Sequence, residues 1–122
     1  LFTRYDLLLT PTTASTAPKL TEDLQSPEIR DGLTVSSSLS ENELAKLIER
    51  MFEKSLRITP YTQLANLTGQ PAISLPTAMT ENGLPLGIQF TAARGREDLL
   101  FQIGKLFEDQ YGFCLPTHYQ KN

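Results

Sequence analysis

The segment 59–92 constrains the fold more than any other part of this 122-residue chain. Residues 72–76 are a compact apolar run closed by Pro76, which is typical of a short buried strand. The pair Asn82-Gly83 follows and is a strong local signal for a reversing turn. Residues 86–90 form a second apolar run, so the two strands are expected to pair as an antiparallel hairpin.

Capping signals and apolar spacing predict three helices around these strands. Helix 40–56 begins with Ser40 and Glu43, which fit a capping box, and its apolar residues recur at i, i+3 and i+4. A short helix over 59–69 begins with a Thr-Pro pair and ends at a glycine that precedes Gln-Pro. The third helix, 97–107, begins with two acidic residues, which suit a helix N-terminus.

An earlier strand is predicted over Tyr5–Thr10, where the apolar run ends at Pro11. Leu7, Leu8 and Leu9 are consecutive, which is typical of a strand covered on both faces in a parallel or mixed sheet. Residues 11–39 are rich in Pro, Ser and Thr without a period, which predicts a long surface loop that is mobile in part. The order favours an α/β sandwich with about three strands in a mixed sheet and three helices.

The N-terminal residues indicate that 1–122 is a single piece of a longer domain. The chain begins Leu1-Phe2-Thr3, without an initiator Met or the layout of a signal peptide, and enters its first core strand almost at once. A narrow sheet with so apolar a strand also leaves exposed edges. We expect further chain to cover those edges.

Composition limits the classes of function. The chain is 39% hydrophobic and 20% charged, which excludes disorder by composition, and no apolar run is long enough to cross a bilayer. A net charge of −3 with interspersed signs gives no basic surface for nucleic acid. The single cysteine, Cys114, excludes an internal disulfide and is compatible with the cytoplasm.

Few residues are candidates for chemistry within the chain. The cluster Ser36-Ser37-Ser38 has no flanking glycines for an oxyanion hole, so we interpret it as a polar loop ahead of a helix cap. His118 is the only histidine, and a lone histidine supplies one metal ligand where zinc sites need three or four. Cys114 has no basic neighbour to lower its pKa. No catalytic residue, metal or cofactor is predicted.

Four other polar residues have structural interpretations that we favour over functional ones. Asp6 and Asn66 are expected to bond backbone groups near a strand start and a helix end. Arg94 and Arg96 either attract an anion at the next helix N-terminus or lie in a solvated turn, and we favour the turn.

Three blocks in order carry a resemblance to a known family. Tyr5–Thr12 has the form Y-D-x-x-L-T-P-T, Asn66–Pro76 has the form N-x-x-G-x-P-A-I-S-x-P, and Gly83–Gln89 has the form G-L-P-x-G-x-Q. This pattern resembles the C-terminal part of the amidase signature family, whose members hydrolyse amide bonds with a Ser–Ser–Lys triad. The resemblance covers 5–12 and 59–109. It implies that the glycine-rich serine loop and the lysine lie upstream of Leu1.

The resemblance also implies a binding surface. In the family, the loop after the first strand and the short helix before the Gly-x-Pro strand line one wall of the substrate pocket. By position, the predicted wall residues are Thr10, Pro11, Thr12, Thr13, Tyr61 and Leu64. Plain capping and packing is the alternative role for these residues.

Two functions therefore stay open. The first is the C-terminal part of an amidase that acts on linear amides, with this fragment inactive alone and its partners an amide substrate and the remainder of the chain. The alternative is a free-standing, non-catalytic binding or scaffold domain that self-associates through its sheet edges. Leu56 stands where tRNA-dependent amidotransferases commonly carry aspartate, which favours a general amidase.

Overall fold

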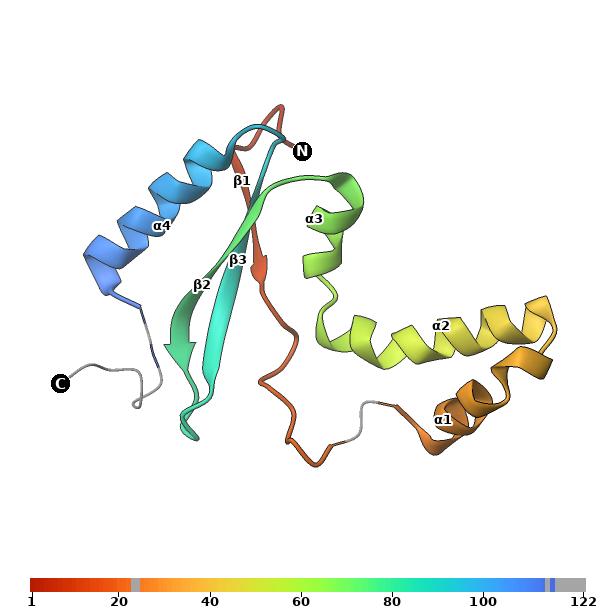
Figure 1. Cartoon of the computed structure of the whole chain (residues 1–122). Helices are drawn as coiled ribbons and strands as arrows, with labels where there is room; N and C mark the ends of the chain where they lie inside the picture. Colours follow the sequence, from red (N-terminus) through yellow and green to blue (C-terminus); the bar gives the residue numbers. More distant parts are fainter. Residues whose placement is uncertain (23–24, 114, 116–122) are drawn as a thin grey trace. The chain divides into compact units, whose positions relative to one another are not determined.

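The structure, a computed structural model, describes residues 1–22, 25–113 and 115 (Figure 1). In chain order the elements are β1 (Leu7–Pro11), α1 (Pro27–Thr34), the 3₁₀ helix η1 (Ser36–Ser38), α2 (Glu41–Ile58), α3 (Thr62–Thr68), β2 (Ala72–Met79), β3 (Pro85–Ala92) and α4 (Glu97–Tyr111). They fall into two compact units. The sheet unit contains residues 1–16 and the chain from Thr59 onward, and the helical unit contains residues 17–58.

The sheet has the strand order β1-β3-β2, so the last strand in sequence is the central one. Leu7 lies opposite Ala92 in the first pairing, and Ile73 lies opposite Phe90 in the second. The predicted α/β class with three strands is confirmed. Both described pairings are antiparallel, however, where a mixed sheet was expected. A continuous apolar run does not by itself distinguish the two directions, since it reports burial only.

Two strands extend further than their prolines predicted. β2 continues past Pro76 to Met79, with a register shift between Pro76 and Ala78, and β1 includes Pro11. Both are edge strands of this sheet, where a missing backbone N–H is tolerated, and a bulge accommodates the irregularity. Proline therefore marks an edge here and not a strand end.

One face of the sheet packs against α4 and forms the core. Because side chains alternate along a strand, Ile88, Phe90 and Ala92 share this face of β3. Phe90 and Ala92 cluster with Leu75 and Leu100, and the rings of Phe90 and Phe107 meet edge to face with centroids 5.8 Å apart. Leu100 and Phe107 of α4 thus pack on the sheet, whereas Leu106 of the same helix is 47% exposed.

Local turn chemistry behaves as predicted in the sheet unit. Gly83 has φ 76° and closes the β2–β3 turn, where its N–H donates to Thr80 O at 2.9 Å. Gly69 ends α3 with φ 65°. The start of α3 differs from the prediction: the helix begins at Thr62, so Pro60 lies before it.

The helical unit contains a helix that the sequence analysis did not predict. Residues 27–38 of the segment interpreted as a long loop form α1 and η1. Ser26 caps α1 by accepting a hydrogen bond from Ile29 N at 3.4 Å, and Pro27 occupies the first turn. Serine followed by proline and glutamate is a helix-start signal, and it was outweighed by the prolines around it.

The predicted capping box of α2 is confirmed. Glu43 N donates to Ser40 Oγ at 3.4 Å, and Ser40 N donates to Glu43 Oε2 at 2.9 Å. The hydrogen bonds from the side chain and the backbone of Ser40 hold the pKa of Glu43 below its ordinary value. Within the described residues, no helix is both long and apolar enough to span a membrane.

Candidate functional site

The predicted wall residues from the first strand lie where the chain leaves the sheet. Thr10 and Pro11 end β1, and Thr12 continues the ladder by donating its N–H to Gly87 O at 3.1 Å. The Thr13 hydroxyl turns back and donates to Ser15 O at 2.7 Å. Hydrogen bonds therefore fix the backbone of Thr12 and the side chain of Thr13.

A polar face lies on the side of the sheet opposite the core. Strand alternation places Gln89 and Thr91 of β3 on it, with Thr10 and Ser74 as the register partners of Gln89 on either side. Thr12 joins them through its hydroxyl, which lies 2.6 Å from Ser74 Oγ. We call these five residues the polar face. Gln89 is 6% exposed and Thr91 is 1% exposed, so the centre of the polar face is buried. Ser74, at the edge of the polar face, is exposed.

Thr10 has an unusual environment on this face. Its Oγ1 atom is buried and has no hydrogen-bond partner among the described residues. Buried hydroxyls are nearly always paired, because an unpaired one has lost its hydrogen bonds to water without replacement. The Thr10 hydroxyl is therefore a group that an additional partner would satisfy.

The other two predicted wall residues come from the start of α3. Tyr61 directly precedes the helix and is 41% exposed, and Leu64 lies in its first turn and is 45% exposed. In the described residues no hydrogen bond joins either of them to the segment 10–13. The structure thus brings Thr10 and Thr12 to one sheet face, and leaves Tyr61 and Leu64 partly exposed at the start of α3.

Arg94 fixes the end of α3 to the end of β3. Its Nε donates to Thr68 O at 2.8 Å, and its Nη2 donates to the same oxygen. Arg96 pairs with Asp98 at 2.9 Å, an interaction that holds the pKa of the Asp98 carboxyl below its ordinary value. Both arginines considered as anion ligands therefore have partners within the protein.

The remaining candidates from the sequence are a serine cluster, a cysteine and a histidine. Ser36, Ser37 and Ser38 form η1, where the Ser38 hydroxyl donates to Val35 O at 2.7 Å. Cys114 and His118 lie outside the described residues. In ranges 1–22, 25–113 and 115, no group of three or more His, Cys, Asp and Glu residues is placed to hold a metal ion.

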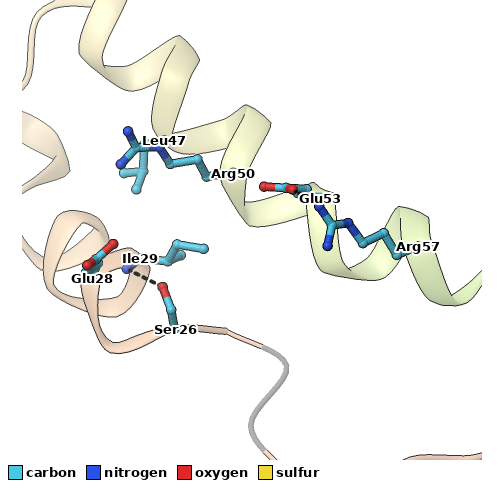
Figure 2. A pocket seen from close by; sticks show the side chains of 7 residues that line it. All are labelled: Ser26, Glu28, Ile29, Leu47, Arg50, Glu53 and Arg57. Carbon is cyan, nitrogen blue, oxygen red and sulfur yellow. Dashed lines mark hydrogen bonds and ion pairs between the residues drawn. The ribbon is translucent and has the colours of Figure 1, made fainter.

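Within the described part of the chain, each of the two units contains a hollow. A cavity of about 550 Å³ lies between α1 and α2, with Ile29 and Leu47 at its apolar part (Figure 2). Arg57 on its rim is paired with Glu53 at 2.5 Å. An open groove of about 860 Å³ runs between β2 and α4. Neither hollow is lined by a predicted wall residue.

Sequence reasoning missed Ser74 and Gln89. Both lie inside quoted motif blocks, and alternation along the hairpin strands was the available signal, because it separates them from the apolar side chains of the same strands. Their connection to the first strand had no local signal, since Thr12 and Ser74 are 62 residues apart.

Comparison with known proteins identifies the family. Residues 1–101 match the family described as Amidase. The chain is 43% identical over 115 residues to a lipoamidase of Enterococcus faecalis, covering 94% of this chain and 16% of that protein. It is 38% identical over 104 residues to the 6-aminohexanoate-cyclic-dimer hydrolase of Pseudomonas sp. (strain NK87), covering 85% of this chain and 18% of that protein.

A third relative belongs to the mitochondrial glutamyl-tRNA(Gln) amidotransferase of Aedes aegypti and is 35% identical over 112 residues, covering 92% of this chain and 18% of that protein. The solved structure of a 6-aminohexanoate cyclic dimer hydrolase superposes with a TM-score of 0.68 at 31% identity, covering 93% of this chain and 21% of that one. The chain therefore spans about a fifth or less of the length of these relatives. With the family match extending over most of its residues, this chain belongs to the amidase family.

Proposed function

We propose that this chain is the C-terminal part of an amidase that hydrolyses a carbon–nitrogen amide bond. The match of residues 1–101 to the amidase family carries the proposal. Two relatives with 43% and 38% identity bear the names of hydrolases, a lipoamidase and a 6-aminohexanoate-cyclic-dimer hydrolase. The preference for a general amidase over a tRNA-dependent amidotransferase rests on Leu56.

The catalytic residues of the proposed enzyme lie upstream of Leu1. A serine hydroxyl there attacks the amide carbonyl, and a serine–lysine relay takes its proton and delivers it to the leaving nitrogen. The C–N bond breaks, ammonia or an amine leaves, and an acyl-enzyme remains. Water then attacks the ester, the serine regains its proton, and the carboxylic acid is released. The chain alone is inactive on this proposal.

The contribution of this chain is one wall of the substrate pocket. The residues are those predicted from the sequence: Thr10, Pro11, Thr12, Thr13, Tyr61 and Leu64. Exposed Tyr61 and Leu64 supply apolar contact, which suits the aliphatic part of an amide. The hydroxyls at the exit of β1 supply hydrogen bonds, and the unpaired Thr10 hydroxyl is one that a further partner would satisfy.

The remainder of the amidase chain is the proposed partner of the sheet. β1 and β2 are its two edges, and Leu9 on β1 is 56% exposed. An apolar edge strand of this kind is stabilised when another segment pairs with it or covers it. We place the enzyme in the cytoplasm, with which a single cysteine is compatible.

The test compares the complete polypeptide with the 122-residue chain. Both are incubated with hexanamide, lipoamide and 6-aminohexanoate cyclic dimer, and the released ammonia or amine is measured. We expect hydrolysis by the complete polypeptide only, with an acyl-enzyme adduct on an upstream serine detected by mass spectrometry. Hydrolysis by the chain alone would refute the placement of the catalytic residues, and an upstream sequence without serine and lysine would refute the mechanism.

A further inference from the structure

A side-chain hydrogen bond crosses the full width of the sheet. Thr12 directly follows β1 and Ser74 belongs to β2, and β3 lies between these strands. Neighbouring strands lie about 4.8 Å apart, so residues on the two edges are ordinarily about 10 Å from each other. The two hydroxyl oxygens are nevertheless only 2.6 Å apart.

The crossing is possible because Gly87 leaves space between the two hydroxyls. A Cβ atom on Gly87 would lie 3.0 Å from both Ser74 Oγ and Thr12 Oγ1, and 3.2 Å from Leu75 O. The φ angle of Gly87 is not positive, so its backbone conformation does not demand glycine. A side chain at position 87 would therefore crowd the hydroxyl pair, which fills the space above Gly87.

The hydrogen bond with Ser74 restrains the side chain of Thr12, at the end of β1. Thr12 is the first residue beyond β1, where backbone pairing with β3 ends, and the χ1 angle of threonine has three staggered rotamers. The hydrogen bond between Thr12 and Ser74, in which either hydroxyl can be the donor, selects the Thr12 rotamer that points its hydroxyl across Gly87. Ser74 itself is held by the β2–β3 ladder.

We propose that Ser74 is a positioning residue that sets the orientation of Thr12 in the substrate wall. This inference rests on the proposed amidase function. Ser74 acts on the reaction only through Thr12, and Gly87 permits the contact. The orientation of Thr12 then determines how that part of the wall meets the acyl side of an amide substrate.

The test uses the complete polypeptide and whichever of hexanamide, lipoamide and 6-aminohexanoate cyclic dimer the wild type hydrolyses fastest. A hydrogen bond of this kind corresponds to roughly a two- to tenfold change in kcat/KM, so Ser74→Ala and Thr12→Val should each lower it by that factor. The double variant should lose no more than Thr12→Val alone, because on this proposal Ser74 acts only through Thr12. Thr12→Ser, which keeps the hydroxyl, should stay within twofold of wild type. Ser37→Ala, at an exposed serine of η1, is the matched control.

Several outcomes separate this inference from its alternatives. Gly87→Ala keeps both hydroxyls but pushes them apart, so it should reproduce the kinetic loss of Ser74→Ala. A merely structural Ser74 would lower the Tm, leave kcat/KM unchanged and add its effect to that of Thr12→Val. If the wild type is active and Ser74→Ala matches Ser37→Ala, the positioning role is wrong and the amidase function stands. If the wild type hydrolyses none of the amides, the proposed function fails and this inference fails with it.

Discussion

Replacing Gly104 by alanine is expected to stabilise the sheet unit, although Gly104 is buried where α4 meets the sheet. A Cβ atom at this position would lie 3.5 Å from Ile73 Cδ1 and 3.7 Å from Leu75 Cδ2. These are ordinary van der Waals distances, so a methyl group fits without displacing its neighbours. The glycine is thus a weak point of the helix and not a requirement of the packing.

Two contributions set the size of the effect. Alanine is favoured over glycine in a helix interior by about 0.8–1.0 kcal/mol. A methyl group buried against two apolar side chains adds at most about 0.8 kcal/mol. The free energy of unfolding should therefore rise by about 1–2 kcal/mol. For a unit of this size each kcal/mol corresponds to roughly 4–8 °C in Tm.

Urea denaturation of the purified chain, followed by circular dichroism, measures the change. Gly83→Ala is the matched control, because its Cβ meets nothing within 4 Å but its φ of 76° strains any L side chain. It should destabilise the hairpin by about 1–2 kcal/mol. A destabilised Gly104→Ala variant would refute the reasoning, since it would mean that α4 and β2 pack more closely than described.

Three further predictions concern other parts of the chain. Protonation of Glu43 weakens the hydrogen bonds that its carboxylate accepts from Ser40. Because the folded-state pKa of Glu43 is lowered, the stability that these bonds contribute is present above the unfolded-state pKa and is lost as the pH falls through the folded-state value. A peptide of residues 38–58 should thus lose helicity in acid, by circular dichroism, and Glu43→Gln should flatten that titration; equal titrations would contradict this. Arg94→Lys should speed amide exchange at the end of α3, because lysine cannot reproduce both contacts with Thr68 O, and unchanged exchange would show that these contacts are dispensable. Leu9→Lys should reduce self-association of the isolated chain in sedimentation, and equal association of both proteins would exclude this edge as the interface.

The parts of the fold that could be predicted depend on neighbours in sequence. The capping box of α2, the turn at Gly83 and the end of α3 at Gly69 each rest on a few adjacent residues, and all three are confirmed. The helix α1 was missed although its signal is also local. Its prolines and hydroxyl residues are typical of loops and of helix starts alike, so only the packing of α1 against α2 and the burial of Ile29 decide between them.

The parts that could not be predicted depend on pairing between distant residues. Nothing near Leu9 indicates that its partner is Phe90 or that the pairing is antiparallel. The same holds for the site: Thr12 was a candidate from its motif, whereas Ser74 gains significance only when register brings it to the same face. A glycine inside a strand, as Gly87 is, favours close approach, but the atoms that approach it come from both edge strands.

The helical unit is an insertion between two parts of one sheet, since β1 precedes it and both partners of the hairpin follow it. The β2–β3 hairpin therefore forms from local contacts, whereas the docking of β1 must wait until the long intervening segment has closed on itself. The entropic cost of that closure grows slowly, by about 0.6 kcal/mol for each doubling of loop length. Insertions, deletions and substitutions within residues 17–58 should therefore have little effect on the stability of the sheet.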